Sequence, residues 1–256
     1  MPSEVLIRPA PPPAEDPVWS GWDVLWIALV TMFSIVFFVF VTTYAAHRLF
    51  YPRLSLMEVA KFPLVTVAAQ LFAYLVVLLF MISIVEGQHN RDFWQAIQWN
   101  WPRTPWIFLT GGVMLSLGLQ GVAHFLPMPK ELPIDRFFQT SAEAWALSIF
   151  GVTMAPLMEE LFFRGFLYPV LARRLGLPIA IFLTSLGFGL IHAPQLGRAW
   201  GPVMVVFLVG VALTLTRAKT RSVASSMLVH IAYNATLSVL LYAGSDGFQH
   251  LEKLNQ

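Results

Sequence analysis

Seven long apolar segments follow one another along this chain, and they constrain its fold more than any other feature. A helix of roughly 17–25 apolar residues crosses the hydrocarbon core of a bilayer. Hydrophobic residues make up 57% of the chain and charged residues 12%, whereas soluble domains carry about 25% charged residues. We therefore expect an all-α, polytopic transmembrane helical bundle of about seven spans, with an interfacial helix as an eighth. The expected spans are residues 24–46, 62–85, 106–126, 144–172, 178–194, 200–216 and 222–244.

The rest of the chain offers no repeat and no polar linker long enough to separate two domains. We expect a flexible N-terminal tail at residues 1–20, a single membrane domain at 21–245 with its catalytic core at 142–241, and a C-terminal tail at 246–256. The N-terminus "MPSEVLIRPAPPPAEDP" is rich in proline and lacks a signal-peptide pattern, so the first span is expected to stay as an anchor. Basic residues divide almost evenly between the two sides, which leaves the orientation open.

Small and aromatic residues predict how the spans pack. Glycines in the third span should let helices approach closely; they are Gly111, Gly112, Gly118 and Gly121. Tryptophans near the span ends should form a belt at the membrane surface; they are Trp19, Trp22, Trp99, Trp101, Trp106 and Trp200.

Three charged residues interrupt the fourth apolar segment, in the stretch "APLMEELFFRGFLY". Each charge at the bilayer centre costs roughly 2.5–3.5 kcal/mol, so Glu159, Glu160 and Arg164 must be paired or face a cavity. Glu160 and Arg164 are spaced i, i+4 and share a helix face, where they neutralise each other. Glu159 is turned about 100° from Glu160 by the helix period. One carboxylate is therefore left without an obvious partner in its own helix.

Two further polar pairs lie inside later spans. Phe188 and His192 share a face of the fifth span ("FGLIH"), and His230 and Asn234 share a face of the seventh ("HIAYN"). Polar and ionisable groups within membranes face the bundle interior and mark functional sites. Pro156, in the fourth span, removes a helical hydrogen bond and predicts a kink there. We expect Glu159, His192, His230 and Asn234 to converge within the membrane.

Several hydrolytic mechanisms are excluded by what the sequence lacks. It has no cysteine, no H-E-x-x-H zinc motif, no G-x-S nucleophile and no aspartate well inside a span. Acid–base catalysis by glutamate and histidine remains. A carboxylate can take a proton from water that a histidine positions, and a second histidine with an asparagine can donate hydrogen bonds to an oxyanion.

In their order and spacing, the polar residues resemble the intramembrane glutamic proteases of the CAAX prenyl protease and bacteriocin-processing family, the type II CAAX endopeptidases. The resemblance covers residues 142–241, whereas the first three spans match only as generic apolar helices. Its three motifs are complete: Glu-Glu-x-x-x-Arg at Glu159, Glu160 and Arg164, Phe-x-x-x-His at Phe188 and His192, and His-x-x-x-Asn at His230 and Asn234.

The resemblance implies catalytic roles for four residues. Glu159 would be the general base that activates water with His192, and His230 with Asn234 would bind the oxyanion. The Glu160–Arg164 pair would support them, as would Phe188. The implied protein is a multi-pass integral protein of a bacterial cell membrane. It would cleave a membrane-associated or lipid-linked peptide or protein without a cofactor or metal, and it would bind no nucleic acid.

Two alternatives stay open at this point. One is a zinc-dependent membrane hydrolase that uses His192, His230 and a glutamate as metal ligands. The other is a non-catalytic membrane protein of the same family, an immunity or secretion partner, in which the polar cluster holds helices together.

Overall fold

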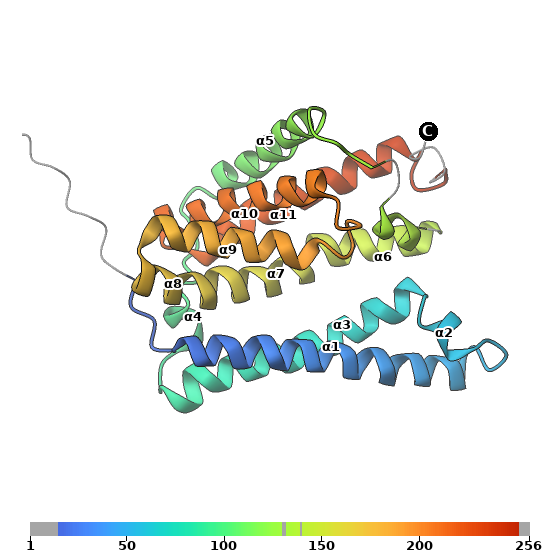
Figure 1. Ribbon diagram of the computed structural model, residues 1–256, viewed down its shortest axis with the longest axis horizontal. Coiled ribbons are helices and arrows are strands. Elements are labelled where there is room, and N and C mark those ends of the chain that lie inside the picture. The colour runs from blue at the N-terminus through green and yellow to red at the C-terminus, as the bar shows by residue number, and fades with distance from the viewer. Residues whose placement is uncertain (1–14, 130–131, 139, 251–256) are drawn as a thin grey trace, which may run out of the picture.

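Helices joined by turns make up the part of the chain that the computed structural model describes, namely residues 15–129, 132–138 and 140–250, and no strand occurs among these residues. Figure 1 shows their arrangement. In chain order they are α1 (Gly21–Leu49), α2 (Leu56–Val59), α3 (Pro63–Ile82), the π-helix η1 (Ser83–Gln88), α4 (Phe93–Ala96), α5 (Pro105–Ala123), the 3-10 helix η2 (Pro133–Phe137), α6 (Ser141–Val152), α7 (Met154–Glu160), the π-helix η3 (Leu161–Leu167), α8 (Tyr168–Leu175), α9 (Leu177–His192), α10 (Trp200–Thr220) and α11 (Val223–Gly244).

Six of the helical stretches are long and apolar enough to cross a membrane, and the protein is an integral, multi-pass membrane protein. The seventh, α9, is apolar but has only 16 residues. The expected all-helical bundle of about seven spans is confirmed. The short helices α2, α4 and η2 lie in the connections between spans. The six long stretches are Gly21–Leu49, Pro63–Gln88, Pro105–Ala123, Ser141–Leu175, Trp200–Thr220 and Val223–Gly244.

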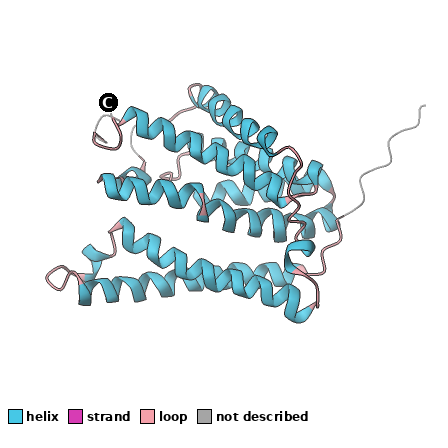
Figure 2. Ribbon diagram, turned by 180° about the vertical axis from the view of Figure 1, so that it is seen from behind, coloured by secondary structure: helices cyan, strands magenta, loops and turns pink. Residues whose placement is uncertain are grey.

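The hairpin of α1 and α3 forms one side of the molecule, and α5 lies on the opposite side against α11 (Figures 1 and 2). The stretch from α6 to α8 runs between them. Its π-helix η3 contributes to both apolar cores, because Leu161 and Phe166 pack into the cluster formed with α1 and α3, whereas Phe163 packs into the cluster formed with α9, α10 and α11. The segment with the three charges therefore lies at the centre of the fold.

This central stretch is not one regular helix. It breaks at Thr153, whose φ of −115° and ψ of −75° separate α6 from α7. The break is three residues before Pro156, which has no N–H to continue the helical ladder, and the predicted kink is confirmed. The π-helical turns of η3 were not predicted. They precede Pro169, and a wider turn keeps its ring away from the carbonyl of Gly165, four residues earlier.

Close helix approach depends on one glycine of α5. A Cβ atom on Gly112 would lie 2.3 Å from the carbonyl oxygen of Val229 in α11, so the two backbones meet there. At the other three candidate glycines of α5 a Cβ would meet nothing within 4 Å. The expectation that these also mediate close packing within the chain is wrong, since they face away from the bundle. They are Gly111, Gly118 and Gly121.

Four of the six tryptophans expected at the membrane surface are exposed, Trp99 is half-buried, and Trp19 is not exposed. Trp22, Trp101, Trp106 and Trp200 are exposed. Trp19 is 1% exposed and packs against Phe166. Of the segment expected as a tail, residues 1–14 lie outside the described residues, whereas residues 15–20 contact the bundle and end in the Ser20–Asp23 capping box that begins α1.

Candidate active site

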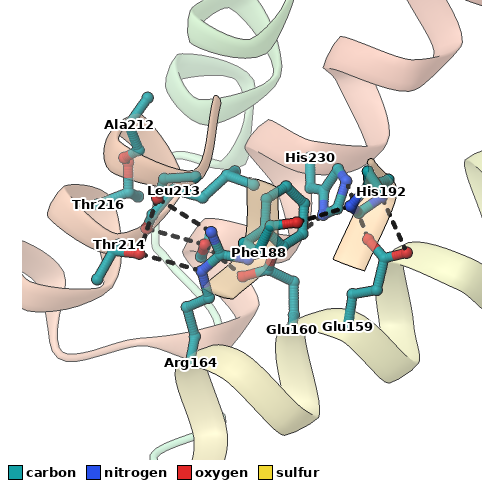
Figure 3. A network of polar contacts seen from close by, with 12 residues as sticks. Glu159, Glu160, Arg164, Phe188, His192, Ala212, Leu213, Thr214, Thr216 and His230 are labelled. Atoms are coloured by element: carbon teal, nitrogen blue, oxygen red, sulfur yellow. Dashed lines mark hydrogen bonds and ion pairs between the residues drawn. The ribbon is translucent and has the colours of Figure 1, made fainter. Parts of the chain in front are cut away.

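A buried ion pair lies at the junction of α7 and η3. Arg164 Nη1 is 2.8 Å from Glu160 Oε1, and both side chains are completely buried, as expected from their i, i+4 spacing. A buried charge of either sign is costly unless it is paired and hydrogen-bonded. Figure 3 shows the pair facing α10 and α11 from the central stretch. The neutral pair explains how two of the three charges in this segment are accommodated.

Arg164 is held in place by α10 and α9 as well. Its Nε donates to the hydroxyl of Thr214 at 3.3 Å, and its Nη2 donates to the carbonyl oxygen of Gly210 at 3.0 Å. The guanidinium also lies over the ring of Phe188, 4.5 Å from its centroid. A cation over an aromatic face is attracted to the ring electrons, and this attraction increases away from water. Arg164 therefore links three parts of the bundle.

Glu160 in turn binds two residues of α11. The hydroxyl of Ser226 donates to its Oε2 at 2.5 Å, and Nδ1 of His230 lies 2.9 Å from its Oε1. Because a carboxylate paired with an arginine only accepts hydrogen bonds, the proton of this contact is on Nδ1 of His230. The same carboxylate thus neutralises Arg164 and orients the imidazole.

Both histidines direct their Nε2 atom toward Glu159. His192 Nε2 lies 3.7 Å from Glu159 Oε1, and His230 Nε2 lies 3.7 Å from Glu159 Oε2. Nδ1 of His192 is 2.7 Å from the carbonyl oxygen of Phe188, so each ring uses Nδ1 for anchoring and turns Nε2 to the same carboxylate (Figure 3). The side chains of Glu159 and His192 are 18% and 16% exposed, whereas that of Glu160 is fully buried. Of the two glutamates, only Glu159 is accessible.

Asn234 lies one turn beyond His230 on α11. Its Nδ2 donates to the carbonyl oxygen of Gly151 at 2.7 Å, just before the break between α6 and α7. Within the described part of the chain, the structure shows no hydrogen bond from Asn234 to Glu159, His192 or His230. Asn234 therefore holds the broken helix against α11.

The structure thus brings together three of the four residues that the sequence motifs single out, Glu159, His192 and His230, from three helices. Their roles remain predictions. The contacts of Ser226 with Glu160 and of Thr214 with Arg164 were not predicted from the sequence. For Ser226 the sequence does contain a signal. Ser226 precedes His230 by four residues and shares its helix face.

The zinc alternative requires several ligand side chains around one ion. Among the described residues, no group of three or more histidine, aspartate or glutamate side chains is arranged to hold a metal ion. Both Nε2 atoms lie 3.7 Å from a Glu159 oxygen.

Part of the chain is similar to known proteins. Residues 140–236 match the Rce1-like family, type II CAAX prenyl endopeptidase Rce1-like, and this range contains all seven motif residues. The chain is also similar to UPF0177 protein YbdI of Lactococcus lactis subsp. lactis (strain IL1403), with 28% identity over 145 residues, which covers 53% of this chain and 75% of the relative. No solved structure matches the chain.

Proposed function

We propose, from the Rce1-like type II CAAX prenyl endopeptidase domain that this chain contains at residues 140–236, that the protein is an intramembrane glutamic endopeptidase. The family supports a membrane protease, and the substrate that it implies is a membrane-associated peptide or protein. The glutamate-and-water mechanism is our inference. The observation that carries it is the pair of histidine Nε2 atoms, each 3.7 Å from a different oxygen of the accessible Glu159.

The proposed reaction begins with a water molecule beside Glu159 and His192. A separation of 3.7 Å exceeds a direct hydrogen bond and suits two groups that share a water. The Nε2 lone pair of neutral His192 accepts one hydrogen bond from this water, while Glu159 removes the other proton as the water oxygen attacks the peptide carbonyl. Glu159 then passes that proton to the departing amine, so the carboxylate is regenerated.

The oxyanion of this step needs donors. Since Nδ1–H of His230 is committed to Glu160, Nε2 of His230 can donate only when the ring is an imidazolium. The second proton of the Asn234 amide supplies another donor, since the hydrogen bond to Gly151 uses only one. Such donors are most effective where water is excluded.

The experiment that tests this function compares membrane proteomes of cells with the wild-type protein and with Glu159→Gln. We expect C-terminal or juxtamembrane fragments that disappear in the variant. Glu143→Gln is the matched control, because this partly exposed glutamate lies at the first turn of α6, where its carboxylate accepts from the hydroxyl of Thr140. If the wild type and Glu159→Gln give identical fragments, the protein is a non-catalytic membrane protein in which the polar cluster holds helices together.

A further inference from the structure

A short segment before α1 lies against the catalytic stretch from outside the family-matched residues. We name residues 15–19 the N-terminal strap. Trp19 is 1% exposed, its indole Nε1 donates to the carbonyl oxygen of Phe166 at 3.0 Å, and the two rings lie 4.6 Å apart. A buried indole that hydrogen-bonds to a π-helical carbonyl is a specific contact, because the wide turns of η3 lack the regular ladder of an α-helix. The strap is therefore anchored to η3.

The same strap supplies the carboxylate of a second buried ion pair. Glu15 Oε1 and Oε2 accept from Nη1 and Nη2 of Arg217 at 2.9 and 3.3 Å, and the side chain of Arg217 is 1% exposed. The guanidinium also lies over the ring of Tyr168, 5.4 Å from its centroid, and Gln98 donates to Glu15 at 3.3 Å. Without Glu15, Arg217 would lose the carboxylate that forks onto it at the end of α10.

Arg173 of α8 fixes the backbone of the strap between these two anchors. Its Nη1 donates to the carbonyl oxygen of Pro17 at 2.7 Å, and its Nη2 donates to that of Trp19 at 3.4 Å. Its contact with Asp16 is of a different kind, because the Asp16 side chain is 89% exposed and the ion pair of 3.3 Å lies in solvent. Exposed ion pairs contribute little. The backbone contacts therefore hold the strap, and Asp16 is dispensable.

The two buried ion pairs occupy consecutive helical turns. Arg164 reaches from η3 to Thr214 of α10, and three residues after Thr214 on α10 comes Arg217. Tyr168 follows Arg164 by four residues and lies under the guanidinium of Arg217. The strap thus connects two elements, because it binds η3 at Phe166 and α10 at Arg217. Arg164 connects the same two elements in the neighbouring turn. Figure 3 shows Arg164 between the central stretch and α10 at this level.

We propose that Glu15 and Trp19 are positioning residues for the catalytic site, which the strap keeps in register by fixing the distance between η3 and α10. This inference rests on the proposed function. If the strap loosens, Arg164 shifts relative to Thr214, Glu160 follows Arg164, and Nε2 of His230 turns from its place beside Glu159. The strap touches none of the residues that face Glu159, so its loss lowers kcat and leaves KM unchanged.

The test uses the full-length chain with Trp19→Phe, which keeps a ring and removes only the N–H donor, and with Glu15→Gln, which keeps the shape and removes the charge. The controls are Trp22→Phe, at a ring that is 71% exposed, and Asp16→Asn. A misplacement of about 1 Å costs up to about 10²-fold in rate, so we expect kcat to fall roughly tenfold in both strap variants. We expect KM to change less than twofold, and the controls to match the wild type.

Hydrogen exchange supplies a readout that does not depend on cleavage. Amides of residues 161–168 and 226–234 should exchange faster in both strap variants than in the controls. Unchanged exchange overturns the proposal, and so does faster exchange with unchanged kcat, because the strap would then brace the helix without affecting the reaction. A rise in KM at constant kcat also overturns it. If the wild type cleaves no substrate, the proposed function fails. The positioning role is tested separately: it is overturned if faster exchange in the strap variants is confined to residues 161–168 and leaves residues 226–234 unaffected.

Discussion

Nδ1 of His230 lies 2.9 Å from Oε1 of Glu160, although the two residues are 70 positions apart in the sequence. This hydrogen bond fixes which nitrogen of the imidazole is available at the site. It also gives Glu160 a second function besides neutralising Arg164. The two adjacent glutamates therefore differ in environment, since one is fully buried among partners and the other is partly accessible between two histidines.

Replacing the accessible glutamate should affect the reaction and little else. Glu159→Gln keeps the size of the side chain but removes the base, and the loss of a general base typically lowers the rate by about 10²–10⁴-fold. Because no direct hydrogen bond to Glu159 is broken, we expect folded yield and the unfolding temperature in detergent to match the wild type. Cleavage of one peptide by purified protein is the measurement. Activity within tenfold of the wild type would contradict the assignment of the base.

Replacing the buried glutamate should also affect stability. Glu160→Gln leaves Arg164 without its counter-charge, and breaking a buried pair in this way costs about 3–5 kcal/mol. We expect a clearly lower folded yield and a lower unfolding temperature than for Glu159→Gln. Both variants should be compared in one expression and thermal-unfolding series. Equal abundance and equal activity would refute the division of roles between the two glutamates.

Removing the amide of Asn234 should depress turnover more than substrate binding. The loss of one oxyanion donor typically lowers kcat by about 10²–10³-fold, because the hydrogen bond strengthens as the carbonyl oxygen becomes negative. Asn234→Ala also loses the bond to Gly151, at a cost of about 0.5–1.5 kcal/mol. We expect faint activity with nearly unchanged KM and a small drop in unfolding temperature. A change in KM alone would argue for substrate binding instead.

The close contact of α5 with α11 should depend on the absence of a side chain at Gly112. Gly112→Ala would place a Cβ 2.3 Å from the carbonyl oxygen of Val229, next to His230, so the helices must separate. Overpacking of this kind costs about 1–3 kcal/mol. Gly118→Ala is the matched control on the same helix, since its Cβ meets nothing within 4 Å. Only Gly112→Ala should lower the temperature of thermal unfolding. Equal unfolding temperatures for the two variants would count against the close approach of the helices.

Chelation separates the glutamate mechanism from the zinc alternative. We expect cleavage by the purified wild type to survive strong chelators and metal content to stay well below one zinc per chain. The zinc alternative instead requires stoichiometric metal that His230→Ala loses, with little effect of Asn234→Ala. Metal analysis of the wild type, His230→Ala and Asn234→Ala, each assayed with and without chelator, decides between the two.

The sequence predicted the spans well because apolar length is a local property. The i, i+4 pairing of Glu160 with Arg164 could be predicted for the same reason, as both lie on one helix face. The convergence of His192 and His230 on Glu159 was expected from the cost of polar groups in hydrocarbon, which forces them inward. Which ring nitrogen faces Glu159 could not be predicted, because it follows from the contacts of the two Nδ1 atoms with Phe188 and Glu160.

Other features required the fold itself. The burial of Trp19 depends on contacts with η3, 147 residues away in the sequence, and a proline-rich segment gives no periodic signal for such a contact. The π-helical turns of η3 depend on both packing and Pro169. Ser226 was overlooked because a serine in an apolar helix most often bonds its own backbone.

The short helix α9 has a consequence for the surrounding lipid. Its 16 residues span about 24 Å, less than the roughly 30 Å of a typical hydrocarbon core, and His192 is its last residue. A helix too short for its bilayer draws the two surfaces together locally, at a free-energy cost that grows with each ångström of mismatch. We therefore expect the access of water to His192 to depend on the acyl-chain length of the lipid as well as on the protein. In vesicles of lipids with progressively longer chains, turnover should decline while the protein stays folded.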